Sequence, residues 1–276
     1  MAGRSLMELP REVLRLIAGK IDQRDFLAVC LTCKGLRLAI MEAREREGKK
    51  IITTLDYTVL VQWQREPGPD VFKYSDSWFR WAHETLRPQP GLVSRWPVDI
   101  MGFFASEREK RTLYRGDLLN LAGFQGDLRM VRWLMEEGEC HSVVTMAITA
   151  LGGNLAVLEY LKSQGCPTDE WTWTGAACGG HLHILKWLRS NGTGWDAGAC
   201  GAAACGGHLG VVKWLREHGC EWDERVCVWA SQEGRIHVLE WARSQNPPAP
   251  WNKDECIHAA EGHEQHEVVR WISRQK

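Results

Sequence analysis

The chain has 276 residues, of which 44% are apolar and 25% are charged, and its formal net charge is −1 at pH 7. This composition is typical of soluble globular proteins, and without a strongly basic balance it leads us to expect no nucleic-acid partner. No apolar run of about eighteen residues and no signal-peptide pattern occur, so we expect no membrane partner and a cytoplasmic or nuclear location, in a host cell if the source is viral, rather than secretion.

The first predicted elements lie in residues 1–45. Apolar side chains at Leu9, Val13, Leu14, Ile17 and Ile21 follow a helical period, and a second amphipathic stretch runs from 26 to 33. A helical unit of this size buries little apolar surface by itself, so it needs a partner or a neighbouring domain.

This segment resembles the F-box. The matching positions are Leu9, Pro10, Glu12, Val13, Leu14, Ile17, Arg24, Asp25, Leu27, Leu31, Cys33, Lys34 and Arg37. F-boxes dock onto the Skp-type adaptor protein of cullin-RING ubiquitin ligases. The resemblance implies an adaptor surface made of Leu9, Pro10, Leu14, Ile17, Phe26, Leu27 and Val29. The family usually has Trp where Leu36 stands and a larger residue where Gly35 stands. The alternative interpretation of residues 1–45 is a plain helical cap for the repeat array.

Residues 46–114 contain two Pro- and Gly-containing breaks, at 65–70 and 87–91, and no convincing repeat. The segment is too aromatic for a free linker, with Trp63, Trp78, Trp81 and Trp96 among its residues. We expect an aromatic-rich connector that caps the next domain, without assigning its topology.

Residues 115–276 are built from a repeated phrase that opens with glycine every 27 residues. The glycines are Gly126, Gly153, Gly180, Gly207 and Gly234, and a sixth copy starts at Gly262 after 28 residues. This period predicts stacked supersecondary units.

Each phrase predicts an amphipathic helix, such as 182–190. A second glycine is expected to end each helix in a left-handed cap, and these glycines are Gly138, Gly165, Gly192 and Gly219. Polar residues at Asp169, Asp196, Asp223 and Asn252 then suit the N-cap of a short helix rich in alanine. The predicted fold is all-α: an F-box-like unit followed by an α-solenoid of about six helix pairs.

These pairs resemble ankyrin repeats, as the phrase at 207–219 shows, but at 27 residues they lack the six that form the family's β-hairpin finger. The array looks like the finger-less, Trp-rich variant found in giant-virus and protist families. Target binding is then expected on the concave face of the short helices, where the candidates are Trp171, Glu224, Arg225 and Trp229.

Two Cys-x-x-His pairs, Cys178 with His181 and Cys205 with His208, lie one repeat apart. Equivalent positions on stacked helices are about 8–10 Å apart, too far for one zinc ion, so we expect no metal. The histidines are predicted to cap or bridge helix starts. No catalytic motif is present, so we expect no catalytic residues, no enzyme activity and no cofactor.

The sequence therefore predicts a protein-interaction adaptor, monomeric by itself, that binds a Skp-type adaptor through 1–45 and an unidentified protein target through the solenoid. The alternative is an ankyrin-like binding scaffold that has no connection to a ligase.

Overall fold

The computed structural model describes residues 117–195 and 197–275, together with residues 76, 79, 80 and 83. The last four belong to a separate compact unit, in which Phe79 and His83 are buried. The expected F-box-like unit and its adaptor surface (Leu9, Pro10, Leu14, Ile17, Phe26, Leu27 and Val29) lie outside the described residues, as does Asp196.

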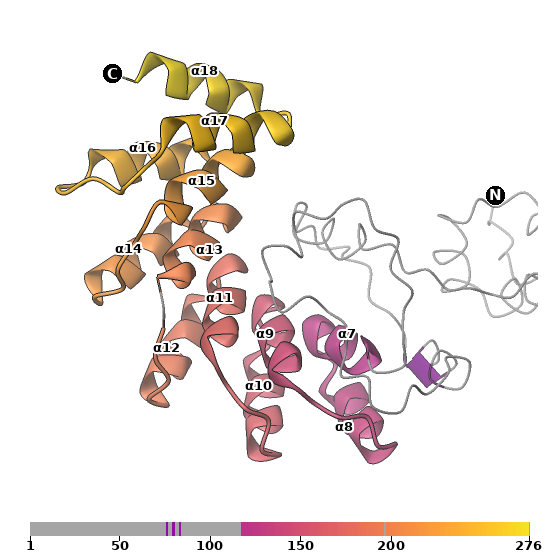
Figure 1. Cartoon of the computed structure of the whole chain (residues 1–276). Coiled ribbons are helices and arrows are strands. Elements are labelled where there is room, and N and C mark those ends of the chain that lie inside the picture. Colours follow the sequence, from indigo (N-terminus) through magenta and orange to yellow (C-terminus); the bar gives the residue numbers. More distant parts are fainter. Residues whose placement is uncertain (1–75, 77–78, 81–82, 84–116, 196, 276) are drawn as a thin grey trace, which may run out of the picture. The chain divides into compact units, whose positions relative to one another are not determined.

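Twelve helices in six pairs make up residues 117–275, and the described residues contain no strand (Figure 1). We call the first helix of each pair an A helix and the second a B helix. The A helices are α7 (Asp117–Gln125), α9 (Val143–Leu151), α11 (Glu170–Cys178), α13 (Gly198–Gly206), α15 (Arg225–Gln232) and α17 (Lys253–Gly262). The B helices are α8 (Leu128–Glu136), α10 (Leu155–Ser163), α12 (Leu182–Ser190), α14 (Leu209–Glu217), α16 (Ile236–Ser244) and α18 (His266–Arg274). The predicted all-helical repeat array is confirmed for this part of the chain.

Two series of left-handed turns mark the repeats. The tight turn inside a pair is made at the 27-residue glycines, as at Gly180 with φ 76°, and the turns after α8, α10, α12 and α14 are made at the second series, as at Gly192 with φ 72°. A residue without Cβ adopts this conformation at little cost. The predicted glycine caps at Gly138, Gly165, Gly192 and Gly219 are confirmed by their positive φ angles.

The last repeat has a different register from the predicted one. Gly262 ends α17, and the left-handed position falls on Glu264, with φ 57°, thirty residues after Gly234. The extra residues lie in the proline-containing loop before Trp251 and in α17, which has 10 residues. The start predicted at Gly262 is therefore wrong by two positions.

The A helices carry the core because they pack against one another from α7 to α17. They are not shorter than the B helices, since α11, α12, α13 and α14 have 9 residues each. Instead they differ in carrying small residues where they face a neighbouring A helix. A Cβ added at Gly175 would lie 2.2 Å from the backbone oxygen of Ala147, so α11 approaches the backbone of α9 at a distance that only glycine permits.

The B helices bury one apolar stripe each, as Ile184, Leu185 and Leu188 do in α12. The opposite side of each B helix is polar and exposed. The eight described cysteines are free, and all of them except Cys140 are buried. Within residues 117–195 and 197–275, no helix is long and apolar enough to cross a bilayer.

Candidate partner-binding surfaces

The starts of three A helices are fixed by local side-chain hydrogen bonds. Asp169 accepts from the N–H groups of Trp171 and Thr172 at 3.1 and 3.3 Å, which confirms its predicted role as the N-cap of α11. Asn252 does the same for α17. Ser142, which the sequence did not single out, caps α9 with Thr145 in a reciprocal pair. These caps hold the first turns of α9, α11 and α17 in place, whereas α13 has no side-chain cap.

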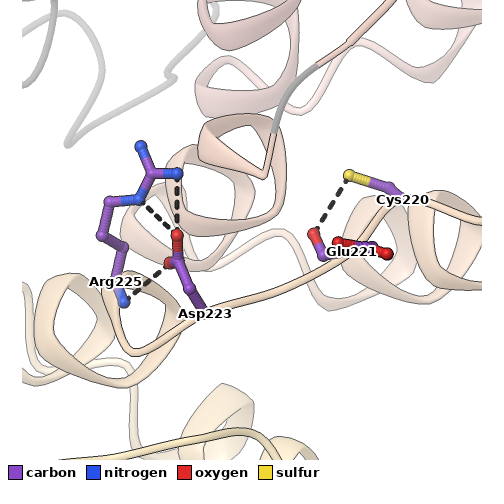
Figure 2. A network of polar contacts seen from close by, with 4 residues as sticks. All are labelled: Cys220, Glu221, Asp223 and Arg225. Atoms are coloured by element: carbon purple, nitrogen blue, oxygen red, sulfur yellow. Dashed lines mark hydrogen bonds and ion pairs between the residues drawn. The ribbon is translucent and has the colours of Figure 1, made fainter.

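The start of α15 is held differently (Figure 2). The Asp223 carboxylate accepts from the Arg225 N–H at 3.0 Å and from its guanidinium at 2.8 Å. The N-cap residue is Glu224, whose own side chain makes no capping bond. The prediction of Asp223 as the N-cap is therefore wrong by one position. From the position before the N-cap, Asp223 still accepts from a free N–H of the helix, and it also fixes the Arg225 head group. In the preceding loop, the Cys220 thiol donates to the Glu221 carbonyl at 3.5 Å.

The first-turn positions of successive A helices are equivalent in the fold but differ in chemistry. Trp171 in α11, Gly198 in α13 and Arg225 in α15 lie nine residues before the tight-turn glycine, and Asp254 in the first turn of α17 lies ten residues before Glu264. A constant backbone therefore presents an aromatic, no side chain, a cation and an anion in turn. Trp171 and Arg225 are half-buried, whereas Glu224, next to Arg225, is exposed.

Trp229 lies one turn further along α15 than Arg225. The Arg225 guanidinium carbon is 5.7 Å from the Trp229 ring centroid. The same indole fills the space beside α13, because a Cβ added at Gly201 would lie 2.8 Å from it. The structure thus brings Glu224, Arg225 and Trp229 together on one helix, where Trp229 also packs between repeats. Trp171 lies two repeats away from them.

Sequence reasoning missed a ladder of hydrogen bonds that joins consecutive pairs. At four tight turns, the residue after the glycine reaches back 30 residues to a carbonyl near the end of the A helix of the preceding pair. Asn154 donates to Phe124 at 2.7 Å, His181 to Leu151 at 3.0 Å, and Arg235 to Cys205 at 3.0 Å. His208 bonds the backbone of Cys178 in the same way. The helix-end carbonyls that lack intrahelical partners are satisfied by this ladder.

This ladder gives the histidines a structural role. A carbonyl only accepts, so Nε2 of His181 carries the hydrogen. Burial lowers the pKa of His181, and its neighbours His183 and His208 lower it further. The pKa of His208 is also lowered, by burial and then by the charge of Arg235. The histidines make no side-chain capping bond at the starts of α12 and α14. They bond instead to the end of the A helix of the preceding pair, which corrects the predicted role. No metal-binding group of three side chains occurs among the described residues.

We expect the array to lose stability as the pH falls below about 6.5. The unfolded histidines titrate near their ordinary pKa, whereas the folded ones titrate lower, so the unfolded state binds more protons in this window. The stability is fully present above the unfolded pKa and is lost as the pH falls toward the folded pKa. Urea unfolding at about pH 7.5 and 5.5 measures the loss.

The matched control is the full chain with His181→Asn and His208→Asn. Asparagine makes the same bond naturally at Asn154 and does not titrate. The loss between the two pH values is expected to be smaller in this variant than in the original chain. An equal loss in both proteins would show that these histidines are not its source.

No protein-family model matches the chain, and no curated protein matches it. Among solved structures, the chain is similar to the pentatricopeptide repeat protein PPR10 in complex with an 18-nt psaJ RNA element, with 14% identity and a TM-score of 0.37 over 97% of this chain. A cysteine-to-serine variant of PPR10 with the same RNA gives the same values. The chain spans 41% of the length of these PPR10 chains.

The expectation of no nucleic-acid partner is corrected here. The repeat protein PPR10, to which the chain is similar, was solved with RNA, and this finding contradicts that expectation. A TM-score of 0.37 is too low to assign the RNA ligand of PPR10 to this chain.

Proposed function

We propose that the chain is a non-enzymatic adaptor whose helical repeat array binds a protein target. One observation supports this most: the A helices repeat in backbone while their first-turn side chains change from Trp171 to Gly198 to Arg225 to Asp254. Repeat arrays bind partners through surfaces in which a constant framework presents variable side chains. The target surface comprises Trp171, Glu224, Arg225 and Trp229.

The chemistry of this surface fits recognition. The Asp223 carboxylate holds the Arg225 guanidinium in place before a partner arrives. This lowers the entropy cost of binding a partner through Arg225. Trp229 is anchored beside Gly201 and yet half-exposed, and aromatic and arginine side chains are frequent hot spots of protein interfaces.

The finer part of the proposal is that residues 1–45 connect the array to a ubiquitin ligase. It is supported by the F-box resemblance of Leu9, Pro10, Leu14, Ile17 and the other matching positions. In this arrangement the rigid array sets the distance between the ligase and a bound target. An ankyrin-like scaffold without a ligase is the alternative.

The purified full chain is expected to bind a Skp-type adaptor, and a Leu9→Ala, Pro10→Ala variant is expected to lose that binding. Truncating apolar contacts at the centre of such an interface costs about 2 kcal/mol or more, a loss of roughly thirtyfold in affinity. Isothermal calorimetry measures it, and circular dichroism checks that the variant keeps its helical signal.

The matched control is a Trp171→Ala, Arg225→Ala variant, whose changes lie in the array. It should bind the adaptor as the original chain does, while retaining fewer target proteins from the cells of the source. No adaptor binding by the intact chain would rule out the ligase connection and leave the scaffold alternative.

A further inference from the structure

The loop between α16 and α17 differs from the loops that follow α8, α10, α12 and α14. Those four loops each begin with a left-handed glycine, whereas no residue of the loop 245–252, all of which the structure describes, has a positive φ. The loop reads QNPPAPWN and so contains three prolines within four residues. Trp195 and Trp222 are 27 residues apart, but Trp222 and Trp251 are 29 apart. This connection therefore holds two extra residues.

The loop is fixed to the array at Ala249, in the same way as the preceding loop is fixed at Cys220. The N–H of Ala249 and that of Cys220 each donate to a carbonyl in the last turn of the preceding B helix, at 3.0 and 2.9 Å. Their carbonyls each accept from an arginine of that helix, at 2.5 and 2.6 Å. Both residues are 0% exposed. Because Ala249 takes the role of Cys220, the two extra residues lie before it, where Pro247 and Pro248 stand.

The three prolines of this loop are exposed, at the outer end of α16 (Figure 1). After a bend at 245–247 the chain runs without a turn to Asn252. The proline ring holds φ near −65°, close to the value of polyproline II. Three residues complete one turn of that helix, so Pro247 and Pro250 share one side, Pro248 lies on a second and Ala249 on the third. The exposure agrees, because only Ala249 is buried.

The exposed segment offers hydrogen-bond acceptors and almost no donors. Proline has no N–H, so residues 247–250 have a single backbone donor, that of Ala249, which is already bonded within the array. The carbonyls of Pro247, Pro248 and Pro250 accept no hydrogen bond from another described residue. Residues 245–252 carry no charge. Phosphate groups require donors or cations, so this chemistry fits a protein partner that itself supplies the donors.

We propose that residues 247–250 are a docking motif for a partner domain whose binding groove is lined by aromatic side chains. Such grooves bind polyproline II segments in which two prolines are three residues apart, as Pro247 and Pro250 are. The prolines pack against the rings of the groove. Tryptophan N–H and tyrosine O–H groups of the groove donate to the free carbonyls of the segment.

Two features of the loop favour recognition over a purely structural role for the prolines. The preceding connection reaches the same buried anchor with two fewer residues, through Gly219 and Cys220, so closing the loop does not require Pro247 and Pro248. The loop is also ordered before a partner binds, because Ala249 is bonded at both its N–H and its carbonyl. A segment that is already restricted loses less conformational entropy on binding.

The test measures binding of the full chain to a panel of purified SH3, WW and EVH1 domains by biolayer interferometry. At least one domain is expected to bind, and soluble poly-L-proline should compete with the chain for it. The affinity should change little as salt rises from about 0.05 to 0.5 M, because the motif is uncharged. A Pro247→Ala, Pro250→Ala variant should lose about tenfold in affinity, which is about 1.4 kcal/mol.

Two controls keep the outcome decisive. Pro167→Ala changes an exposed proline in the loop before α11 and should leave the affinity unchanged. A variant that lacks Pro247 and Pro248 and carries Asn246→Gly brings Trp251 back to 27 residues after Trp222. It should keep the urea midpoint of the original chain and bind none of the domains.

Three results would overturn the proposal: binding of the intact chain to no domain of the panel, equal affinities of the original chain and the alanine variant, or unfolding of the shortened variant. The last would give the two prolines a structural role. Residues 1–45 and the A-helix surface do not enter this test, so its failure leaves the proposed function untouched.

Discussion

Replacing Trp173 by alanine is expected to lower the free energy of unfolding by about 3–5 kcal/mol. Its side chain is 0% exposed and is the largest of the fully buried side chains in the described residues. Its Nε1 donates to the Thr193 hydroxyl at 3.2 Å, and its ring meets Trp195 edge-on at 5.0 Å. The change leaves a cavity between α11 and the loop that follows α12. Urea unfolding followed by far-UV circular dichroism measures the loss.

Two comparisons separate the core role of Trp173 from a general effect of removing tryptophan. Trp171→Ala acts on the same helix at a half-exposed position and should cost about 1 kcal/mol. Trp173→Phe keeps most of the ring and should cost less than the alanine variant. Equal losses for Trp171→Ala and Trp173→Ala would contradict the assignment of Trp173 to the core and of Trp171 to the surface.

Replacing Gly175 by alanine is expected to destabilise the chain by about 2 kcal/mol, although alanine is the better helix former by about 1 kcal/mol. The added Cβ would lie 2.2 Å from the Ala147 carbonyl oxygen and 3.4 Å from the Leu151 nitrogen. Both obstacles are backbone atoms, so α11 has to move away from α9. Gly175→Val should cost more, and urea unfolding compares the three proteins.

Gly210→Ala is the matched control, because it makes the same chemical change inside a helix of the same length. Gly210 is exposed in α14, and no atom lies within 4 Å of the position its Cβ would take. Alanine should therefore stabilise the chain there by about 0.5–1 kcal/mol. A stabilising effect at both positions would show that the close approach of α11 and α9 is not rigid.

Local chemistry made most of the array predictable. The glycine period placed both left-handed turns of a repeat, and the apolar stripe placed the buried side of helices such as α12. The last repeat was misplaced because Gly262 looks like the next glycine of the series. The turn instead falls on Glu264, a residue type that seldom adopts a positive φ.

The ladder between pairs could not be read from residue types. Asn154, His181 and Arg235 differ in charge and shape, and only their common distance to the preceding A helix gives them one role.

The surroundings of the candidate target residues were not predictable. Arg225 and Trp229 were predicted as candidates on the concave face of the short helices. The structure shows that the Asp223 carboxylate holds the Arg225 guanidinium and that the Trp229 ring packs against Gly201. The second contact depends on how α13 and α15 pack, whereas the first is a local contact between residues two positions apart.

The ladder bonds from Asn154, His181 and Arg235 each span 30 residues of chain. Contacts that close such short loops give a low relative contact order, which favours rapid folding. A pair can dock onto the preceding pair as soon as its own residues have left the ribosome, because it needs no segment from the far end of the chain. The array can therefore fold during synthesis, one repeat at a time, in the order in which it is translated.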